Sequence, residues 1–266
     1  MIVSRAERAA NYVVLALFAA FAIAPIGIAL ATALAPSTTS PGGLEVFRQA
    51  WTEGEFSRYM LTSATVAVVV VVVAVLASLL AGYAFGTMAV RGSGWLFPLF
   101  LLGLMVPTEA IVVPLFYDLR ALGLTNTLWA VALPQIAQSI AFGTYWMRAY
   151  FRSAPRPVME AARIDGAGSW RTLWSILVPI GRPAVVTLVL LVFMWTWNEF
   201  LIPLVMSPNG TFRTAPLALA LFKGQHVQAT GLLAAAAVLV ALPVVVVYLF
   251  LQRHFIRGMV EGAVRE

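Results

Sequence analysis

The chain has 266 residues, of which 61% are hydrophobic and only 11% are charged, with a net charge of +6 and no cysteine. Soluble domains carry about 25% charged residues, so a water-soluble globule is excluded, as are a disordered chain and a disulfide-stabilised secreted fold. The absence of cysteine also excludes thiolate metal sites. The composition indicates an integral membrane protein.

Long uncharged stretches recur along the chain, and a helix needs about 20 mainly apolar residues to cross a bilayer. Continuous apolar runs such as 66–73 do not fit the alternating pattern of a barrel strand. The first run is longer than the core of a signal peptide, so we expect it to be retained. The sequence predicts one all-α membrane domain over residues 1–266, with six transmembrane helices at about 11–35, 62–90, 95–117, 125–150, 184–206 and 231–252.

Basic residues are unevenly distributed between the two sets of loops, and the richer set is expected on the cytoplasmic side. Most of the 17 lysine and arginine residues lie in 1–10, 148–182 and 253–266. We therefore expect both termini and the 151–182 loop to be cytoplasmic. The positive charge is interpreted as this topology signal and not as a nucleic-acid-binding surface, because the sequence has no basic and aromatic patch of a binding domain.

Motifs of catalysis are missing from the sequence. Lys223 is the only lysine and no glycine-rich phosphate loop precedes it, so the chain does not hydrolyse nucleotides by that mechanism. His226 and His254 lie at opposite ends of the last predicted helix and cannot share a metal ion. We expect no catalytic, cofactor or metal site, and energy for any transport must come from a partner subunit or an ion gradient.

The 151–182 loop is the most informative segment. Pro155 and Pro157 end the preceding helix, and Gly166 supplies the left-handed residue that ends a short helix over 158–165. Ser169 is expected to cap a second helix whose apolar face carries Trp170, Leu173, Trp174 and Leu177. This helical hairpin could lie on anionic lipid or dock on a protein, and the periodicity alone favours neither.

At this loop the sequence resembles a known family. Glu160-Ala161-Ala162, three residues, Gly166, nine residues and then Ile176-Leu177-Val178-Pro179 are similar to the EAA loop of ABC importer permeases, with Val178 in place of a leucine. Three further segments resemble the carbohydrate-importing branch, although the tail does not end in the usual glycine: 161–168, 197–200 and 261–265.

The resemblance implies a maltose-type permease, similar to the smaller of the usual two subunits, in a bacterial-type plasma membrane. Such a subunit works with a second permease, with two ATPases that bind ATP and Mg²⁺, and with an extracytoplasmic solute-binding protein that delivers a sugar. The resemblance also implies that the hairpin couples to the ATPase, through Glu160, Ala161, Ala162, Asp165 and Gly166.

Two carboxylates, Glu109 and Glu199, lie within predicted helices at a depth that corresponds to the outer half of the membrane core. A lipid-facing carboxylate costs at least about 2.5 kcal/mol, so Glu109 and Glu199 should face the helix bundle or a wet cavity. They are interpreted as polar contacts between helices, as the lining of a sugar path together with Asn198 and a stacking face of Trp197 or Trp195, or as a proton relay. The third interpretation is the weakest.

From the residues and this resemblance together, we expect the chain to be a sugar-importing ABC permease. The alternatives are an ABC permease for another solute, or a gradient-driven carrier that uses Glu109 and Glu199 as proton sites. Gly82 and Gly86 have the spacing of a close helix contact and are expected to have a packing role only.

Overall fold

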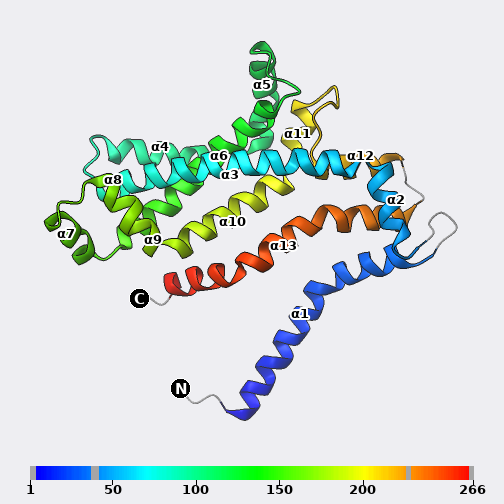
Figure 1. The fold of residues 1–266 in the computed structure, drawn as a ribbon, viewed down its shortest axis with the longest axis horizontal. Coiled ribbons are helices and arrows are strands. Elements are labelled where there is room, and N and C mark those ends of the chain that lie inside the picture. The colour runs from blue at the N-terminus through cyan, green and yellow to red at the C-terminus, as the bar shows by residue number, and fades with distance from the viewer. Residues whose placement is uncertain (1–3, 37–41, 226–228, 264–266) are drawn as a thin grey trace. The chain divides into compact units, whose positions relative to one another are not determined.

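The computed structural model describes residues 4–36, 42–225 and 229–263. Within these ranges all regular elements are helical, so the all-α prediction is confirmed (Figure 1). The elements are α1 (Arg5–Leu34), α2 (Glu45–Glu53), α3 (Phe56–Thr87), α4 (Ser93–Met105), α5 (Thr108–Ala121), α6 (Leu128–Ser153), α7 (Arg156–Ile164), α8 (Ser169–Arg171), the π-helix η1 (Thr172–Leu177), α9 (Val178–Ile180), α10 (Arg182–Asn198), α11 (Leu201–Met206), α12 (Ala215–Gln225) and α13 (Thr230–Ala263).

The chain divides into two compact units. The first comprises Met1–Arg58 and Ala218–Pro243 and includes α1, which begins with a capping box in which Ser4 and Glu7 exchange side-chain and backbone hydrogen bonds. The second comprises Tyr59–Leu217 and Val244–Glu266 and contains the sites discussed below.

Three helices of the described chain are long and apolar enough to cross a membrane: α1, α3 and the 230–252 part of α13. They overlap most of the predicted spans 11–35 and 62–90 and all of 231–252. Up to five spans result if each of two bent helix pairs counts as one: α4 with α5, and the helices over Ser169–Ile180 with α10. α6 overlaps most of the predicted span 125–150 but is less apolar than these three helices, because amide and hydroxyl side chains occupy one of its faces.

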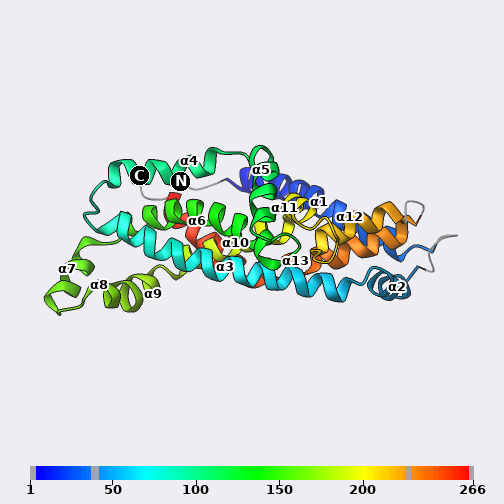
Figure 2. The same cartoon turned by 90° about the horizontal axis from the view of Figure 1, so that it is seen from above.

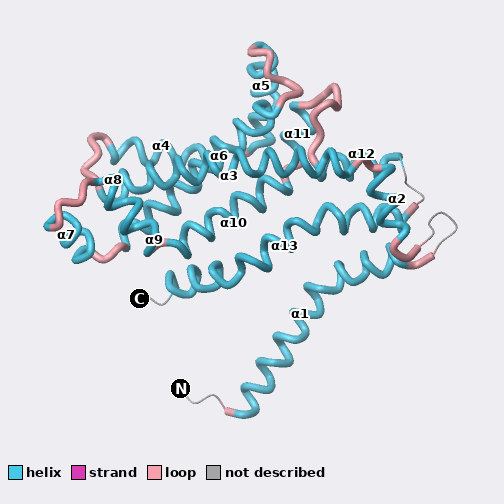
Figure 3. Tube along the Cα trace, in the orientation of Figure 1, coloured by secondary structure: helices cyan, strands magenta, loops and turns pink. Residues whose placement is uncertain are grey.

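Two predicted helices are broken, which corrects the continuous spans 95–117 and 184–206. α4 and α5 meet at 96° around Pro107. Val106 is extended because a proline disfavours helical backbone at the residue before it, and Pro107 is extended as well. α10 ends at Asn198, Glu199 is extended, and α11 starts at Leu201 (Figure 3). Both breaks lie where a glutamate was expected inside a helix.

α3 and α6 pack with their backbones close together. A Cβ on Gly82 would lie 2.6 Å from Cβ of Met147, and one on Gly86 would lie 2.9 Å from Cβ of Phe151. One turn earlier, a Cβ on Gly143 would overlap Oγ of Ser78. The packing role predicted for Gly82 and Gly86 is confirmed.

The segment before α10 joins it at a sharp bend. The helices over Ser169–Ile180 meet α10 at 82°, with Gly181 at the corner. α6 holds both sides of this corner: the Tyr150 hydroxyl donates to the Leu177 carbonyl and the Trp146 indole donates to the Ala184 carbonyl, each at 3.0 Å. In Figures 1 and 2, α7, α8 and α9 lie together at one end of α10, and α11 lies toward its other end.

Candidate functional site

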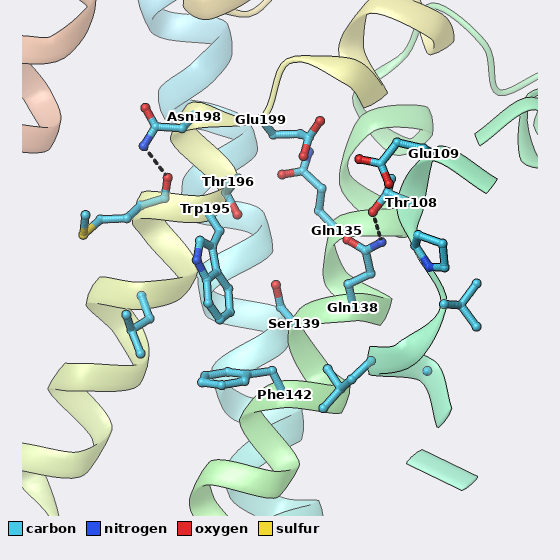
Figure 4. A pocket seen from close by; sticks show the side chains of 16 residues that line it. Thr108, Glu109, Gln135, Gln138, Ser139, Phe142, Trp195, Thr196, Asn198 and Glu199 are labelled. Atoms are coloured by element: carbon cyan, nitrogen blue, oxygen red, sulfur yellow. Dashed lines mark hydrogen bonds between the residues drawn. The ribbon is translucent and has the colours of Figure 1, made fainter. Parts of the chain in front are cut away.

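A cavity of about 610 Å³ opens in the second unit, where the breaks after α4 and α10 face α6 (Figure 4). Its volume lies within the roughly 300–1,000 Å³ of small-molecule sites. It is lined by Gly103, Leu104, Val106, Pro107, Thr108, Glu109, Gln135, Gln138, Ser139, Phe142, Leu191, Met194, Trp195, Thr196, Asn198 and Glu199.

Three amide side chains are fixed around this cavity by their own hydrogen bonds. Gln138 donates from Nε2 to the Thr108 hydroxyl at 2.7 Å, which ties α6 to the start of α5. Gln135 is buried and donates to the Val131 carbonyl, and Asn198 donates to the Met194 carbonyl. Because each amide is held in place, the cavity presents a preformed set of polar groups.

Both predicted carboxylates line the cavity, and each lies at the start of a short helix. Glu109 is in the first turn of α5. The Glu199 carboxylate accepts a hydrogen bond from the Ile202 backbone N–H at 3.0 Å, in the first turn of α11. The positive end of a helix dipole stabilises a carboxylate there. The described residues that line the cavity include no lysine or arginine.

The other end of the cavity is aromatic (Figure 4). Trp195 is 49% exposed, and its ring meets that of Phe142 edge to face with 4.7 Å between the centroids. Trp197, which the sequence nominated for stacking, is 4% exposed, packs on Phe193 and does not line the cavity. Trp195 is therefore the indole that a solute in the cavity can reach.

The cavity brings together three of the four residues nominated for a solute path: Glu109, Asn198 and Glu199. Sequence reasoning missed the contribution of α6. A signal was present, because Gln135, Gln138, Ser139 and Phe142 recur at the spacing of one helical face.

The hairpin predicted in the 151–182 loop forms a second candidate site. α7 ends as expected at Gly166, whose φ is +70°. The Gly166 N–H bonds to the Arg163 carbonyl and the Ala167 N–H bonds to the Ala162 carbonyl, which together make a Schellman motif. The predicted left-handed glycine is confirmed.

The second arm of the hairpin differs from the prediction. Gly168, not Ser169, is the N-cap residue of α8, and no side chain caps this helix. The arm continues as a π-helix, in which the Val178 N–H bonds to the Leu173 carbonyl five residues back. This wider turn precedes Pro179, whose ring disfavours a regular α-helix at that point.

The expected apolar face of this arm is only partly buried. Leu173 and Leu177 lie in the core and Trp174 packs against it, whereas Trp170 is 67% exposed. On the first arm, Ala162 is buried while Glu160, Ala161, Asp165 and Gly166 are exposed. Ile164 is 86% exposed. The hairpin therefore presents two large apolar side chains, Ile164 and Trp170, beside exposed charged groups.

Comparison with known proteins identifies the family. Residues 78–261 match the family described as the binding-protein-dependent transport system inner membrane component. The chain belongs to this family. The predicted ABC importer permease identity is thereby confirmed, and so is the prediction of a multi-pass transport subunit that is not an enzyme and whose ATPase is a separate chain.

Several curated relatives are similar over most of their length. The trehalose transport system permease protein SugB of Mycobacterium tuberculosis is 31% identical, with 98% of this chain and 99% of the relative covered. The arabinooligosaccharides transport system permease protein AraQ of Halalkalibacterium halodurans is 33% identical, with 86% and 81% covered. The probable ABC transporter permease protein YurM of Bacillus subtilis is 34% identical, with 86% and 75% covered.

The fold also matches a solved structure. A chain in the crystal structure of a bacterial ABC transporter involved in the import of the acidic polysaccharide alginate aligns with a TM-score of 0.77 at 22% identity, covering 96% of this chain and 99% of that one. The fold is thus that of an ABC importer permease. An importer permease of this kind works with ATPase subunits, a solute-binding protein and a second permease.

Proposed function

We propose that the chain is the membrane-spanning subunit that forms part of the translocation path for a sugar or oligosaccharide. The observation that carries this proposal is the cavity with carboxylates and amides at one end and Trp195 at the other. Sugar hydroxyls need hydrogen-bond donors and acceptors, and the apolar faces of sugar rings suit a flat aromatic surface. Two relatives named for the transport of trehalose and of arabinooligosaccharides support the same class of solute.

Glu109, Asn198 and Glu199 would contact the solute directly. Trp195 would supply the stacking face in place of Trp197, which is buried beside Phe193. This assignment competes with a role of the two glutamates in helix packing alone. Exposure favours the path: Glu109 and Asn198 are exposed and Glu199 is half-buried, whereas a purely structural polar contact would be enclosed.

The same proposal covers topology and location. The chain would form one permease domain over residues 1–266 with six spans, in a bacterial plasma membrane. Both termini and the 151–182 loop would face the cytoplasm. The broken pairs α4–α5 and α10–α11 each supply one span, because irregular backbone at membrane depth is tolerated where it lines a cavity.

The hairpin would transmit ATP hydrolysis to this path. Glu160, Ala161, Ala162, Asp165 and Gly166 form or support the surface that docks on a partner ATPase, where ATP and Mg²⁺ bind. Exposed Ile164 and Trp170 provide apolar anchors for such a contact. The second permease of the complex would be a different chain, so that the two permeases form a heterodimer.

Reconstituted transport tests the proposal. The complete complex, purified with its solute-binding protein, is placed in vesicles and offered trehalose, maltose, diacetylchitobiose and arabinooligosaccharides. We expect uptake of at least one sugar that requires ATP and survives a protonophore. Uptake that the protonophore abolishes would indicate a gradient-driven carrier, and uptake of none of these sugars would contradict the assignment of solute class.

A further inference from the structure

Asn126 stands out in the loop between α5 and α6 because its φ is +61°. Residues other than glycine seldom adopt this left-handed conformation, although asparagine does so more readily than most. The loop is fixed on both sides: Gly123 ends α5 with the hydrogen bond of Leu124 N–H to the Leu119 carbonyl, and the Thr127 hydroxyl caps α6. Asn126 is thereby held in one orientation.

The hydrogen bonds of Asn126 all reach across to the end of α11. Its backbone N–H donates to the Met206 carbonyl at 2.9 Å. Its Oδ1 accepts from the Asn209 backbone N–H at 3.0 Å and from the Ser207 hydroxyl at 3.4 Å. The partners are some 80 residues away in sequence, so these contacts join two separate parts of the second unit.

α11 is consequently tied at both ends. Its first turn is held by the Glu199 carboxylate through the Ile202 N–H. Its C-terminal end is held by Asn126, through the backbone bond to the Met206 carbonyl and through Oδ1, which accepts from Ser207 and Asn209 directly after the helix. Between these ends Ile202 and Met206 are fully buried, and the helix packs against α5 and α6 (Figure 1).

We propose that Asn126 is a positioning residue for the cavity: its Oδ1 fixes Ser207 and Asn209 at the C-terminal end of α11 and thereby holds Glu199, at the other end, where the carboxylate lines the cavity. The significance for transport rests on the proposed function, since it requires that the cavity carries solute. The ordering of α11 by Asn126 does not depend on the proposed function. It is expected because a helix of six residues is too short to stay ordered on its own.

Substitutions can separate the contribution of the left-handed backbone of Asn126 from that of its Oδ1 acceptor. Glycine at 126 would keep the left-handed backbone and the N–H but lose the Oδ1 acceptor. Aspartate would keep an acceptor oxygen and a tolerance for the left-handed conformation. Asn126→Gly therefore removes only the side-chain hydrogen bonds, and Asn126→Asp should restore them.

Hydrogen exchange of the complete complex, followed by mass spectrometry, tests the ordering of α11 by Asn126. In Asn126→Gly we expect exchange to rise roughly 5- to 30-fold in peptides over 207–212 and also over 201–206, the effect of losing one or two hydrogen bonds. Asn126→Asp should exchange like the unchanged protein. A rise confined to 207–212, or no rise, would overturn the proposal, because Glu199 would then be independent of Asn126.

A matched control and a double variant complete the test. Asn209→Ala keeps the backbone N–H that Asn126 binds and should leave exchange unchanged. In vesicle uptake of whichever sugar of the panel is transported, Asn126→Gly should raise KM in the native background but add little in the Glu199→Gln background. Additive effects would overturn the proposal. If no sugar of the panel is transported, the proposed function fails while the exchange result still decides the role of Asn126.

Discussion

Gly82 of α3 and Met147 of α6 approach so closely that a Cβ on the glycine would lie 2.6 Å from that of the methionine. Atoms linked to the backbone cannot move aside as the tip of a flexible side chain can. The contact recurs one turn away at Gly86 and at Gly143, so three successive turns of the two helices depend on small residues. These three contacts, called the α3–α6 seam below, join α3 to α6, and another face of α6 lines the cavity.

Gly82→Val should therefore destabilise the membrane domain. Overpacking a tight contact costs about 1–3 kcal/mol. We expect the purified complex to unfold at a lower temperature in a thermal scan. Gly103→Ala serves as the control, because its Cβ would meet only the Cβ of Ala141 at an ordinary 3.7 Å. Equal thermal stability of Gly82→Val and the native protein would contradict the packing role.

The α3–α6 seam also offers a rescue. Gly143→Ala places a methyl group against the Ser78 side chain. Adding Ser78→Gly removes that side chain and should recover part of the lost stability, giving a non-additive pair in a double-mutant cycle. Recovery is measured as the unfolding temperature of the double variant relative to Gly143→Ala alone.

Two replacements of Glu199 should separate the effect of its negative charge from the effect of the hydrogen bond by which it caps α11. Glu199→Gln keeps an oxygen that can accept the Ile202 N–H, so insertion and assembly should be intact while uptake weakens. Glu199→Ala loses the cap as well, at a cost of about 1 kcal/mol. Uptake kinetics and the yield of assembled complex are the measurements. Unchanged kinetics in Glu199→Gln would refute its role in the path, and lost assembly would indicate a packing role instead.

Gly166→Val should uncouple the hairpin. A Cβ at Gly166 meets nothing within 4 Å, so any effect arises from its φ of +70° and not from a clash. A β-branched residue there is strained by roughly 1–2 kcal/mol. We expect loss of ATPase pull-down and of substrate-stimulated ATP hydrolysis at normal amounts of membrane protein, with a milder loss in Glu160→Ala.

Gly168→Val provides a closely matched control for that substitution. Gly168 is also surrounded by open space, but its φ is −68°, which valine adopts readily. It should retain the ATPase. Normal pull-down and stimulation in Gly166→Val would mean that the hairpin is only an interfacial element.

Cysteine labelling can settle the topology, because the chain has no native cysteine. In intact cells, a membrane-impermeant maleimide should label Asn209→Cys and should label Ser169→Cys only after permeabilisation. Both positions are exposed. A reporter after Glu266, which lies outside the described residues, should be cytoplasmic. The reverse labelling would show that the inferred orientation is wrong.

Hydropathy located the long helices because a membrane span must be apolar over many residues, and that requirement is visible in sequence. The breaks were harder to predict. Pro98, Pro114 and Pro134 lie inside continuous helices, whereas Pro107 accompanies a bend of 96°. A proline alone does not determine the outcome, because the neighbouring packing decides whether its freed carbonyl can be satisfied.

The candidate site was predictable to the extent that its residues were costly in lipid. Glu109 and Glu199 were identified because a carboxylate at membrane depth costs free energy unless it faces other helices or water. The choice between Trp195 and Trp197 depended on the direction in which the end of α10 faces, which only the tertiary structure fixes. Asn126 carries no charge and belongs to a short loop, so its link to residues 206–209 could not be read from sequence.

The bend at Gly181 places the hairpin and the cavity at opposite ends of α10. The 17 residues of α10 make a helix about 25 Å long at 1.5 Å per residue. Tyr150 and Trp146 bind the chain on both sides of the corner, so both sides of the corner are attached to α6. A tilt of α10 by about 10° about this corner would move its far end, beside the cavity, by about 4 Å. A displacement of that size is enough to admit or block a water molecule.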